Sequence, residues 1–415
     1  MKYGVGGGEV GLGVVVVEQH LVSQRYALTR LHHLYALDPA HLARLHTPTD
    51  VCHVRKDICI APASHASVLW ARDLVGVGVA ALEQGMYGRA SEWFTAARDV
   101  THHHKTGTEQ DQALREKKQR QIHHLHILLN LTLAATAQEA LEEEVTEVEK
   151  SDSLPATTKD HHATTRLCRG HTISDAGSRL RCRVNARGSS WLTLMPVKME
   201  EHSLDPLILS FHDVLSPHQL AVLRHLATPM LQEAVIQGME TEVTHNYRSS
   251  YTSWLHHHIH PVVAAANRMI AALTGLEVDE SKDEAERLQI NLYAAGGHYV
   301  PHMDFMALYR TLWEADEPDQ KVMKQFPSGD RIATFMFYMS DVEEGGWTVF
   351  PRLGVGVKPR QGSAVFWYNL LPSGKGDPRT LHSACPVLRG SKWVSNKWIK
   401  YYPQLHHKPC LPLVK

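Results

Sequence analysis

The stretch LQINLYAAGGHYVPHMDF, residues 288–305, joins a strand pattern to a pair of potential metal ligands. LQINLY is typical of a β-strand, and the glycine pair that follows it indicates a turn. Beyond the turn lie His302 and Asp304, the only His-x-Asp in the sequence. Because side chains at positions i and i+2 of an extended segment point to the same side, this imidazole and this carboxylate can reach one metal ion.

A third ligand is available at His382, in the strand-like segment TLHSACPVL. Two histidines and one carboxylate leave three positions open on an octahedral ion, which is typical of non-haem Fe(II) oxygenases. The chain has 30 histidines, so a downstream histidine alone carries little weight. Lys392, at the start of the next strand, adds a cation for the distal carboxylate of a cosubstrate, although an isolated lysine there would otherwise simply be solvated.

Composition places the chain among ordinary globular proteins. It has 415 residues, 43% hydrophobic and 21% charged, which predicts two or three domains. A formal net charge of -1 gives no argument for nucleic acid or an anionic membrane as a partner. The first 20 residues lack the features of a secretory signal, and no segment has the roughly 18 to 20 apolar residues that span a bilayer.

The distribution of helix-like and strand-like patterns along the chain predicts an α+β protein with five regions. Helical periodicity dominates the second region and short β-like segments dominate the fourth. Close turns between short strands favour a double-stranded β-helix, or jelly roll, preceded by an all-α module. The regions are an atypical N-terminal region for which truncation is one interpretation (1–60), a helical module (61–141), a linker with Cys168 and Cys182 (142–200), a jelly-roll domain (201–403) and a tail (404–415).

Residues 207–402 resemble the catalytic domain of collagen-type prolyl 4-hydroxylase α subunits, which are Fe(II)- and 2-oxoglutarate-dependent dioxygenases. The matching phrases are FHDVLS, LTGLEV, LQ-x-x-x-Y-x-x-GG-x-Y-x-PH-x-D-F, RIAT-x-x-FYMSDVE-x-GG, TVFP, GSAVFWYNL, SGKGD and LHSACPVL-x-G-x-KWVSNKWI. Their length and order make the resemblance far more specific than the three metal ligands alone.

The resemblance implies roles for seven residues. Iron would be bound by His302, Asp304 and His382, and Lys392 would pair with the distal carboxylate of 2-oxoglutarate. The 2-oxoglutarate pocket would be lined by Tyr293, Thr334 and Trp398, for which ordinary sandwich core is the competing interpretation.

The implied reaction is that of a procollagen-proline 4-dioxygenase. It hydroxylates C4 of peptidyl proline in X-Pro-Gly repeats, consumes O2 and 2-oxoglutarate, releases succinate and CO2, and uses L-ascorbate to restore over-oxidised iron. Two alternatives stay open: another 2-oxoglutarate-dependent hydroxylase acting on lysyl or non-collagen prolyl residues, and a non-catalytic subunit that binds proline-rich chains.

The resemblance also implies disulfides and partners. Cys385 and Cys410 match one disulfide pair of the family, and Cys168 and Cys182 resemble a second, which implies an oxidising compartment. In the family the α subunit forms an α2β2 tetramer with protein disulfide isomerase in the endoplasmic reticulum lumen, and it acts on procollagen. A zinc site is the weaker interpretation of the cysteines.

Outside the catalytic region the resemblance is thinner. ALEQGMYGRASEWFTAARD resembles one helical hairpin of the tetratricopeptide-like (TPR-like) peptide-binding module, where Tyr87 is the only tyrosine between residues 62 and 141. The segment after Asp304, residues 306–329, is longer than in the family and is expected to form a flap beside the metal. The clusters His102–His104 and His256–His258 are interpreted as surface histidines, and Asn130 begins a glycosylation sequon.

Overall fold

The computed structural model describes residues 25–35, 37–39, 71–103, 125, 128, 129, 132, 156–171, 180–186, 190–234, 247–306 and 327–409. The chain divides into two compact units, Met1–Pro155 and Ala156–Lys415. Four sequence predictions lie wholly or mostly outside the described residues: the flap predicted over 306–329, of which 307–326 are not described, the Asn130 sequon, Cys410 and the side chains of His102–His104.

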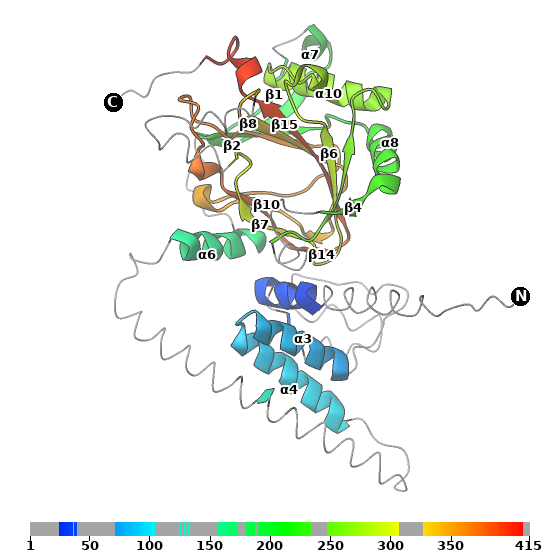
Figure 1. Cartoon of the computed structure of the whole chain (residues 1–415), viewed down its shortest axis with the longest axis vertical. Helices are drawn as coiled ribbons and strands as arrows, with labels where there is room; N and C mark the ends of the chain where they lie inside the picture. The colour runs from blue at the N-terminus through cyan, green and yellow to red at the C-terminus, as the bar shows by residue number, and fades with distance from the viewer. Residues whose placement is uncertain are drawn as a thin grey trace, which may run out of the picture. The chain divides into compact units, whose positions relative to one another are not determined.

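The first unit contains a pair of packed helices, α3 (Ala71–Glu83) and α4 (Tyr87–His103) (Figure 1). Gly85 separates them with a φ of 71°, a conformation that glycine adopts without steric cost. Trp93, Phe94 and Ala97 of α4 are fully buried on one face, as their helical spacing predicts. The two helices and the break between them are confirmed, whereas the TPR-like character of residues 61–141 stays a prediction.

The second unit is built mainly from antiparallel strands with helices at its surface. The helices are α6 (Ala156–Cys168), α7 (Ser190–Leu194), α8 (Pro217–Ala227) and α10 (Pro261–Thr274). Short 3-10 helices are η3 (Thr228–Met230), η4 (Glu280–Lys282), η5 (Pro351–Leu353), η6 (Pro378–Thr380) and η7 (Tyr402–Gln404).

The described residues of this unit form three sheets, and every pairing between the strands of these sheets is antiparallel. In spatial order the major sheet has β1 (Cys182–Asn185), β2 (Val197–Leu204), β3 (Leu207–His212), β12 (Ala364–Tyr368), β8 (Arg331–Tyr338), β15 (Lys392–Lys400), β6 (Leu288–Tyr293), β5 (Tyr251–Leu255) and β4 (Gln232–Glu233). The minor sheet has β11 (Val355–Val357), β10 (Thr348–Phe350), β13 (His382–Ala384) and β7 (Tyr299–His302). A third sheet pairs β14 (Val387–Arg389) with β9 (Glu344–Gly345).

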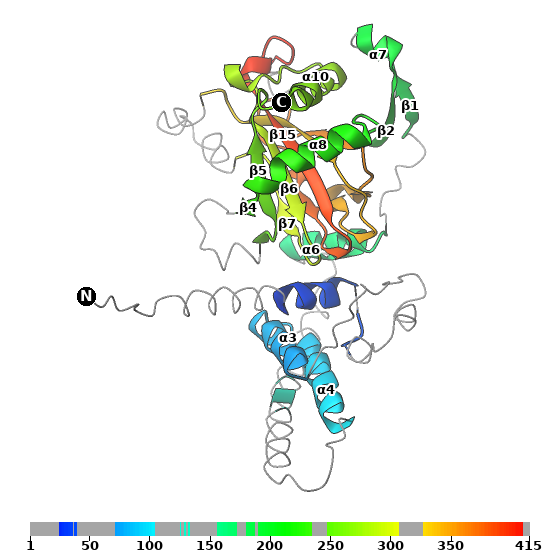
Figure 2. The same cartoon turned by 90° about the vertical axis from the view of Figure 1, so that its right-hand side faces the viewer.

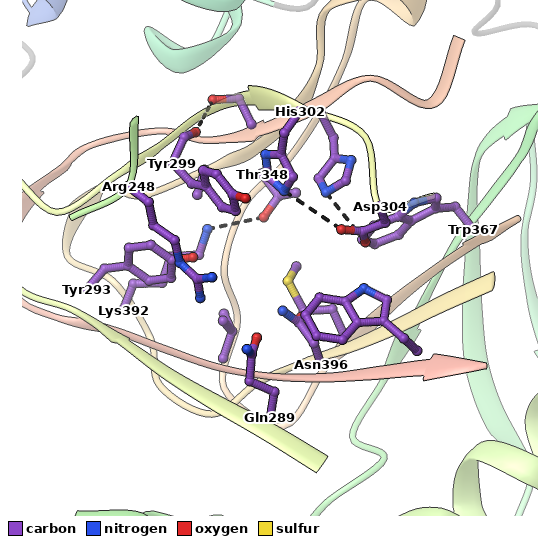
Figure 3. Close-up of a pocket in the computed structure, with 16 residues that line it drawn as sticks. Arg248, Gln289, Tyr293, Tyr299, His302, Asp304, Thr348, Trp367, Lys392 and Asn396 are labelled. Carbon is purple, nitrogen blue, oxygen red and sulfur yellow. Dashed lines mark hydrogen bonds and ion pairs between the residues drawn. The ribbon is translucent and has the colours of Figure 1, made fainter. Parts of the chain in front are cut away.

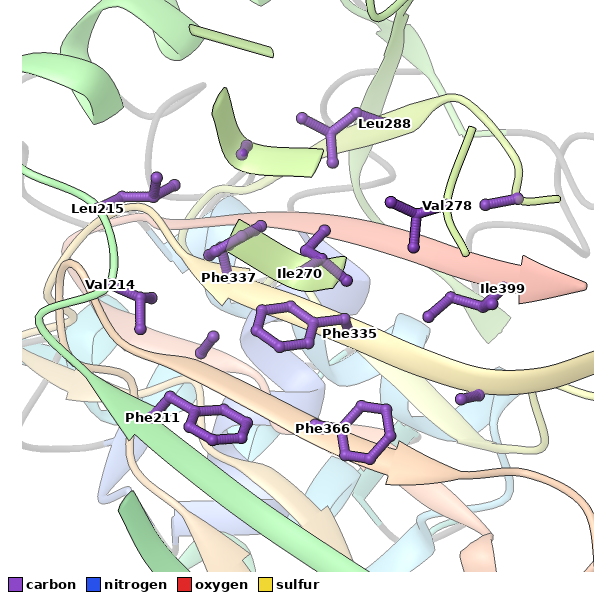
Figure 4. Packing of buried hydrophobic residues seen from close by; sticks show 14 of the residues in the cluster. Phe211, Val214, Leu215, Ile270, Val278, Leu288, Phe335, Phe337, Phe366 and Ile399 are labelled. Atoms are coloured by element: carbon purple, nitrogen blue, oxygen red, sulfur yellow. The ribbon is translucent and has the colours of Figure 1, made fainter. Parts of the chain in front are cut away.

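One face of the major sheet packs against helices. Phe335 and Phe337 of β8 and Phe366 of β12 point to this side, where they meet Ile270 of α10 and Leu288 of β6 (Figure 4). Figure 2 shows α8 lying across the strands on this face. Ser216 caps α8 by accepting a hydrogen bond from the Gln219 amide, and serine is a preferred residue at this position of a helix. This helical layer makes the sheet a rigid base for the opposite face.

The opposite face of the major sheet packs against the minor sheet. Because side chains alternate along a strand, Met336 and Tyr338 of β8 point away from Phe335 and toward this second core. They pack there with Trp367 of β12 and with Phe350 of β10, which belongs to the minor sheet. Two antiparallel sheets therefore face one another, and the expected β-rich C-terminal domain is confirmed.

The predicted linker, residues 142–200, contributes to the folded second unit. Helix α6 lies in it and packs against the minor sheet, where Arg352 of η5 forms an ion pair of 2.8 Å with Asp160. Strand β1 lies in it as well and forms the edge of the major sheet through its pairing with β2. Residues 156–200 are thus part of the domain.

The disulfide prediction is wrong. Cys168, at the end of α6, is bonded to Cys385, which directly follows β13, and their Cα atoms are 5.5 Å apart. Cys182 is free and exposed. The packing of α6 on the minor sheet brings together two cysteines that are 217 positions apart in the chain, and sequence spacing gives no sign of that proximity.

Among the described residues, no helix combines the length and the apolar character that a bilayer crossing requires.

Candidate functional site

A pocket between the two sheets contains three potential metal ligands. His302 ends β7 and His382 begins β13, and the two are directly paired in adjacent antiparallel strands. Asp304 lies in the bend two residues beyond β7. One ligand atom from each of the three residues lies within 4.8 Å of the others. The tertiary structure therefore brings together the three side chains that the sequence analysis singled out.

Backbone carbonyls orient both imidazoles. Nδ1 of His302 lies 2.8 Å from the Val300 oxygen, and Nδ1 of His382 lies 3.0 Å from the Thr380 oxygen. A carbonyl can only accept, so both Nδ1 atoms carry the proton and both Nε2 lone pairs remain available. These Nε2 atoms lie 3.8 and 3.7 Å from the Asp304 carboxylate oxygens. The donor set is thus two neutral imidazole nitrogens facing one carboxylate.

The electrostatics of the cluster favour the protonation states that a metal ion needs. Burial, assisted by nearby His382, lowers the pKa of His302 to about 3. Burial alone would raise the pKa of Asp304, but the surrounding His382, His302 and Arg331, together with the hydrogen bond from Thr334, outweigh it and keep that pKa below its ordinary value. A neutral imidazole and an ionised carboxylate are the forms that bind a divalent metal, so these residues fit Fe(II).

Thr334 supports the metal side of the pocket. It was expected to line a 2-oxoglutarate pocket, but its Oγ1 donates a 2.7 Å hydrogen bond to Asp304 Oδ2. The same Oγ1 accepts a 2.9 Å hydrogen bond from Asn369 Nδ2. Thr334 and Asn369 are fully buried. Two successive hydrogen bonds, from Asn369 to Thr334 and from Thr334 to Asp304, therefore hold the carboxylate in one orientation; we call this pair the Thr334–Asn369 relay. Strand geometry alone does not position Asp304, because β7 ends at His302.

Lys392 places a buried cation in the same pocket (Figure 3). It is 1% exposed, and its Nζ donates a 3.1 Å hydrogen bond to Thr348 Oγ1. The rings of Tyr293 and Tyr338 lie 5.7 and 5.8 Å from Nζ. Burial lowers the pKa of Lys392 to about 7. Within the described part of the chain no carboxylate forms an ion pair with it, so a bound anion would gain a strong partner here.

Tyr293 and Trp398, the other two residues expected at the pocket, both line it. Register explains this, because Lys392 is paired with Tyr293 and Trp398 is paired with Thr334 in neighbouring strands. The guanidinium of Arg331 stacks on the Trp398 ring at 3.8 Å. Trp398 is therefore held rigidly at the wall of the pocket.

Sequence reasoning missed Arg248 and Thr348. Arg248 lines the pocket, is 9% exposed, and lies 4.9 Å from the centre of the Tyr299 ring. Its Nε donates a 2.9 Å hydrogen bond to Ser250 Oγ, and its Nη2 donates a hydrogen bond to Asn291 Oδ1. No local motif marks Arg248, whereas Thr348 stands in the phrase TVFP and could have been found from its place on the strand facing Lys392.

Comparison with known protein families identifies the class of enzyme to which the C-terminal residues are similar. Residues 288–400 match the model of the 2OG-Fe(II) oxygenase superfamily. Residues 288–400 of the C-terminal unit therefore carry a 2OG-Fe(II) oxygenase domain, a class that implies Fe(II), 2-oxoglutarate (2OG) and O2. The His302, Asp304 and His382 cluster is its candidate iron site.

Individual relatives show which members of this oxygenase class the chain is similar to. The chain is 42% identical to prolyl 4-hydroxylase subunit alpha-1 of Gallus gallus over 283 residues, which is 67% of this chain and 52% of that protein. It is 44% identical to the Homo sapiens protein of the same name over 251 residues, 59% of this chain and 44% of that protein. The oxygenase domain is thus similar to that of prolyl 4-hydroxylase α subunits, which confirms the predicted resemblance.

The chain spans about half the length of the curated relatives it matches. Among solved structures, the viral collagen prolyl hydroxylase of Paramecium Bursaria Chlorella virus-1 in its 2OG complex is 25% identical. That match covers 46% of this chain and 95% of the viral one, with a TM-score of 0.35.

Proposed function

We propose that this chain is a procollagen-proline 4-dioxygenase that hydroxylates C4 of peptidyl proline in X-Pro-Gly repeats. One observation carries the proposal: ligand atoms of His302, Asp304 and His382 lie within 4.8 Å of one another, in a pocket that also holds the buried Lys392. A facial set of two imidazoles and a carboxylate leaves iron positions for a keto acid and for O2. We further propose that the two facing sheets form a double-stranded β-helix.

In this proposal His302, Asp304 and His382 hold the iron, and the Thr334–Asn369 relay keeps the Asp304 carboxylate in its binding orientation. Bound Fe(II) with 2-oxoglutarate and O2 supplies the oxidising chemistry, releasing succinate and CO2. The residues of the chain orient the reactants and exclude bulk water from the pocket, which suppresses oxidation in the absence of substrate.

The distal carboxylate of 2-oxoglutarate would bind Lys392. Lys392 is a better candidate than Arg248, because two nitrogens of the Arg248 guanidinium already donate to Ser250 and Asn291, whereas Lys392 donates to Thr348 alone among the described residues. The Thr348 hydroxyl, 3.1 Å from Nζ, can bond to the same carboxylate, and Tyr293 and Trp398 would form the walls. Arg248, beside Tyr299, would remain on the side of the iron ligands.

Substrate and partners are proposed by similarity to the relatives. Proline-rich chains such as procollagen would bind the helical module of residues 61–141, for which the packed pair α3 and α4 gives support. Protein disulfide isomerase would be the β subunit of an α2β2 tetramer in the endoplasmic reticulum lumen, with L-ascorbate restoring over-oxidised iron. The Cys168–Cys385 disulfide suits such an oxidising compartment.

A (Pro-Pro-Gly)-type peptide tests the proposal directly. The purified full chain is incubated with the peptide, Fe(II), 2-oxoglutarate and ascorbate, with and without the isomerase, and the peptide is analysed by mass spectrometry. We expect addition of one oxygen per hydroxylated proline and matched release of succinate. The His382→Ala variant serves as the inactive control.

Two other functions would give different results. Another hydroxylase of the class would modify lysyl peptides, or prolines outside X-Pro-Gly repeats, in a peptide panel. A binding subunit would retain proline-rich peptides while a folded, iron-loaded sample releases no succinate, and that result would overturn the proposed activity.

A further inference from the structure

A second cluster of potential metal ligands lies apart from the residues that line the pocket. It consists of His256, His258 and Glu280, and one ligand atom of each lies within 4.8 Å of the other two. His256 and His258 directly follow β5, and Glu280 begins η4, in the connection between α10 and β6. The cluster His256–His258 was interpreted above as surface histidines, and the tertiary structure adds a carboxylate to it.

Glu280 is a carboxylate held in place at this cluster. Its side chain is 8% exposed, and its Oε1 accepts a 3.1 Å hydrogen bond from the His257 backbone amide. His256 Nδ1 lies 3.1 Å from the same oxygen. The other oxygen, Oε2, is buried and has no hydrogen-bond partner among the described residues. Burial alone would raise the pKa of Glu280, but hydrogen bonds from His257 and His256 and the positive charge of nearby Lys397 outweigh it and lower that pKa. Lys397 makes no ion pair with this carboxylate among the described residues. Oε2 is therefore still without a direct partner, which is costly for a buried oxygen unless a cation contacts it.

The two imidazoles are accessible from solvent and face this carboxylate. The side chain of His256 is 38% exposed and His258 is exposed, and their ring centres are 5.1 Å apart. Neighbouring elements limit their movement, because β5 ends at Leu255 and α10 begins at Pro261. His260 has a separate task, since its Nδ1 accepts from the Val262 amide as the cap of α10.

We propose that His256, His258 and Glu280 form a binding site for Zn²⁺, separate from the iron site. Two imidazole nitrogens and one carboxylate oxygen are a donor set that zinc accepts, with water in the fourth position. Ligand atoms of a tetrahedral zinc site lie roughly 3.4 Å apart, given bonds of about 2.0–2.1 Å. Small rotations of the exposed imidazoles reach that spacing, whereas Glu280 is already fixed.

Zinc at this site would join two segments that are separated by helix α10. It would tie the loop after β5 to the segment that leads into β6, the strand that carries Tyr293. Trp254, two residues before His256, lies against Trp398 of the pocket wall, with ring centres 6.0 Å apart. The ion would therefore stabilise the edge of the sheet next to the pocket.

Zinc binding is measured on the full chain in a His302→Ala background, so that the iron site does not compete for the ion. Equilibrium dialysis against Zn²⁺ with metal analysis is compared between this chain, a H256A/H258A variant and a Glu280→Gln variant. A H218A/H225A variant is the matched control, because it also removes two exposed imidazoles, from α8. We expect H256A/H258A to lose one zinc per chain, Glu280→Gln to bind that zinc at least tenfold more weakly, and the control to lose none.

A second measurement separates metal loss from misfolding. Zn²⁺ should raise the unfolding temperature of the background chain and of the control, but not that of H256A/H258A, because only a bound ligand stabilises the native state. Glu280→Gln keeps the size of the side chain and so tests the site without a cavity. Equal zinc content in all variants would overturn the site and show that Glu280 only anchors the loop through its hydrogen bonds. The background chain needs no turnover, so this outcome is independent of the hydroxylase assay.

Discussion

Thr334 Oγ1 donates a 2.7 Å hydrogen bond to Oδ2 of Asp304, although the two residues are 30 positions apart. Thr334 lies in the centre of β8, which is covered on both faces, whereas Asp304 lies in a bend outside any strand. The carboxylate therefore takes its orientation from the rigid major sheet. Asn369, which directly follows β12, completes the arrangement by donating to Thr334 Oγ1 at 2.9 Å.

Replacing Thr334 by valine should weaken metal binding. Valine has nearly the same shape but cannot donate to Asp304, and it leaves the buried Asn369 amide without its acceptor. Loss of a hydrogen bond to a metal ligand typically costs about 10- to 100-fold in metal affinity. Anaerobic titration with Fe(II) or Co(II) measures this change. Thr334→Ser keeps the hydroxyl and should bind metal nearly as well as the native chain, and equal affinity of the valine variant would exclude the positioning role.

Removing the cation of Lys392 should weaken 2-oxoglutarate binding without changing metal affinity. Truncating one partner of a buried charge pair costs about 2–5 kcal/mol, so Lys392→Ala should raise the Kd for 2-oxoglutarate by at least about 30-fold. Calorimetric titration of the Co(II)-loaded protein gives this Kd, and the Co(II) affinity of the same variant is the control. If 2-oxoglutarate binds Lys392→Ala normally, Arg248 would become the candidate for the distal carboxylate.

The affinity for 2-oxoglutarate should fall as pH rises above about 7. Burial lowers the pKa of Lys392 from 10.5 to about 7 in the ligand-free protein, whereas a bound carboxylate favours the ammonium form. Below pH 7 the ammonium is already present and the Kd is flat. Above it, binding must take up a proton, so the Kd rises by up to about tenfold per pH unit. Calorimetry at pH 8 in buffers of different ionisation enthalpy should detect this uptake, and no uptake would contradict the assignment.

The same lysine affects stability in the ligand-free state. Between its folded pKa of about 7 and its ordinary value of 10.5, the unfolded chain binds the extra proton and the folded chain does not. The free energy of unfolding contributed by Lys392 should therefore increase with pH across this window. Urea unfolding at pH 7 and pH 9 measures it, and Lys392→Met should show a smaller increase than the native chain.

Loss of the Cys168–Cys385 disulfide should destabilise the oxygenase domain. Removing a native disulfide typically costs about 2–5 kcal/mol, so Cys168→Ser should lower the free energy of unfolding by that amount. Cys182→Ser is the matched control, because Cys182 is exposed and free, and it should change little. Peptide mapping of the non-reduced protein checks the pairing itself, and a Cys385–Cys410 peptide would contradict the structure.

Local patterns were sufficient for several central elements of the second unit, among them β6, β8, β12, β15 and α8. RIATFMFY predicts a strand, which the structure shows as β8. The segment is apolar on both faces, so only the structure shows that Phe335 points toward the helices and Met336 toward the minor sheet. Ser216 and Gln219 mark the start of α8, because each side chain accepts a hydrogen bond from the backbone amide of the other within one helical turn. The His302-x-Asp304 spacing also predicted correctly that these two side chains lie close together. The bend after β7 and the hydrogen bond from Thr334 set the final position of Asp304.

What sequence alone determined here is the identity of the chemical groups and the elements that carry them, because strand alternation and helix capping depend on neighbours within a few residues. The meeting of distant groups was decided by the tertiary structure: Cys168 with Cys385, Arg248 beside Tyr299, and Glu280 against His256. Those contacts arise from how sheets and helices pack, and packing depends on the whole set of buried side chains. No spacing within a single segment encodes it.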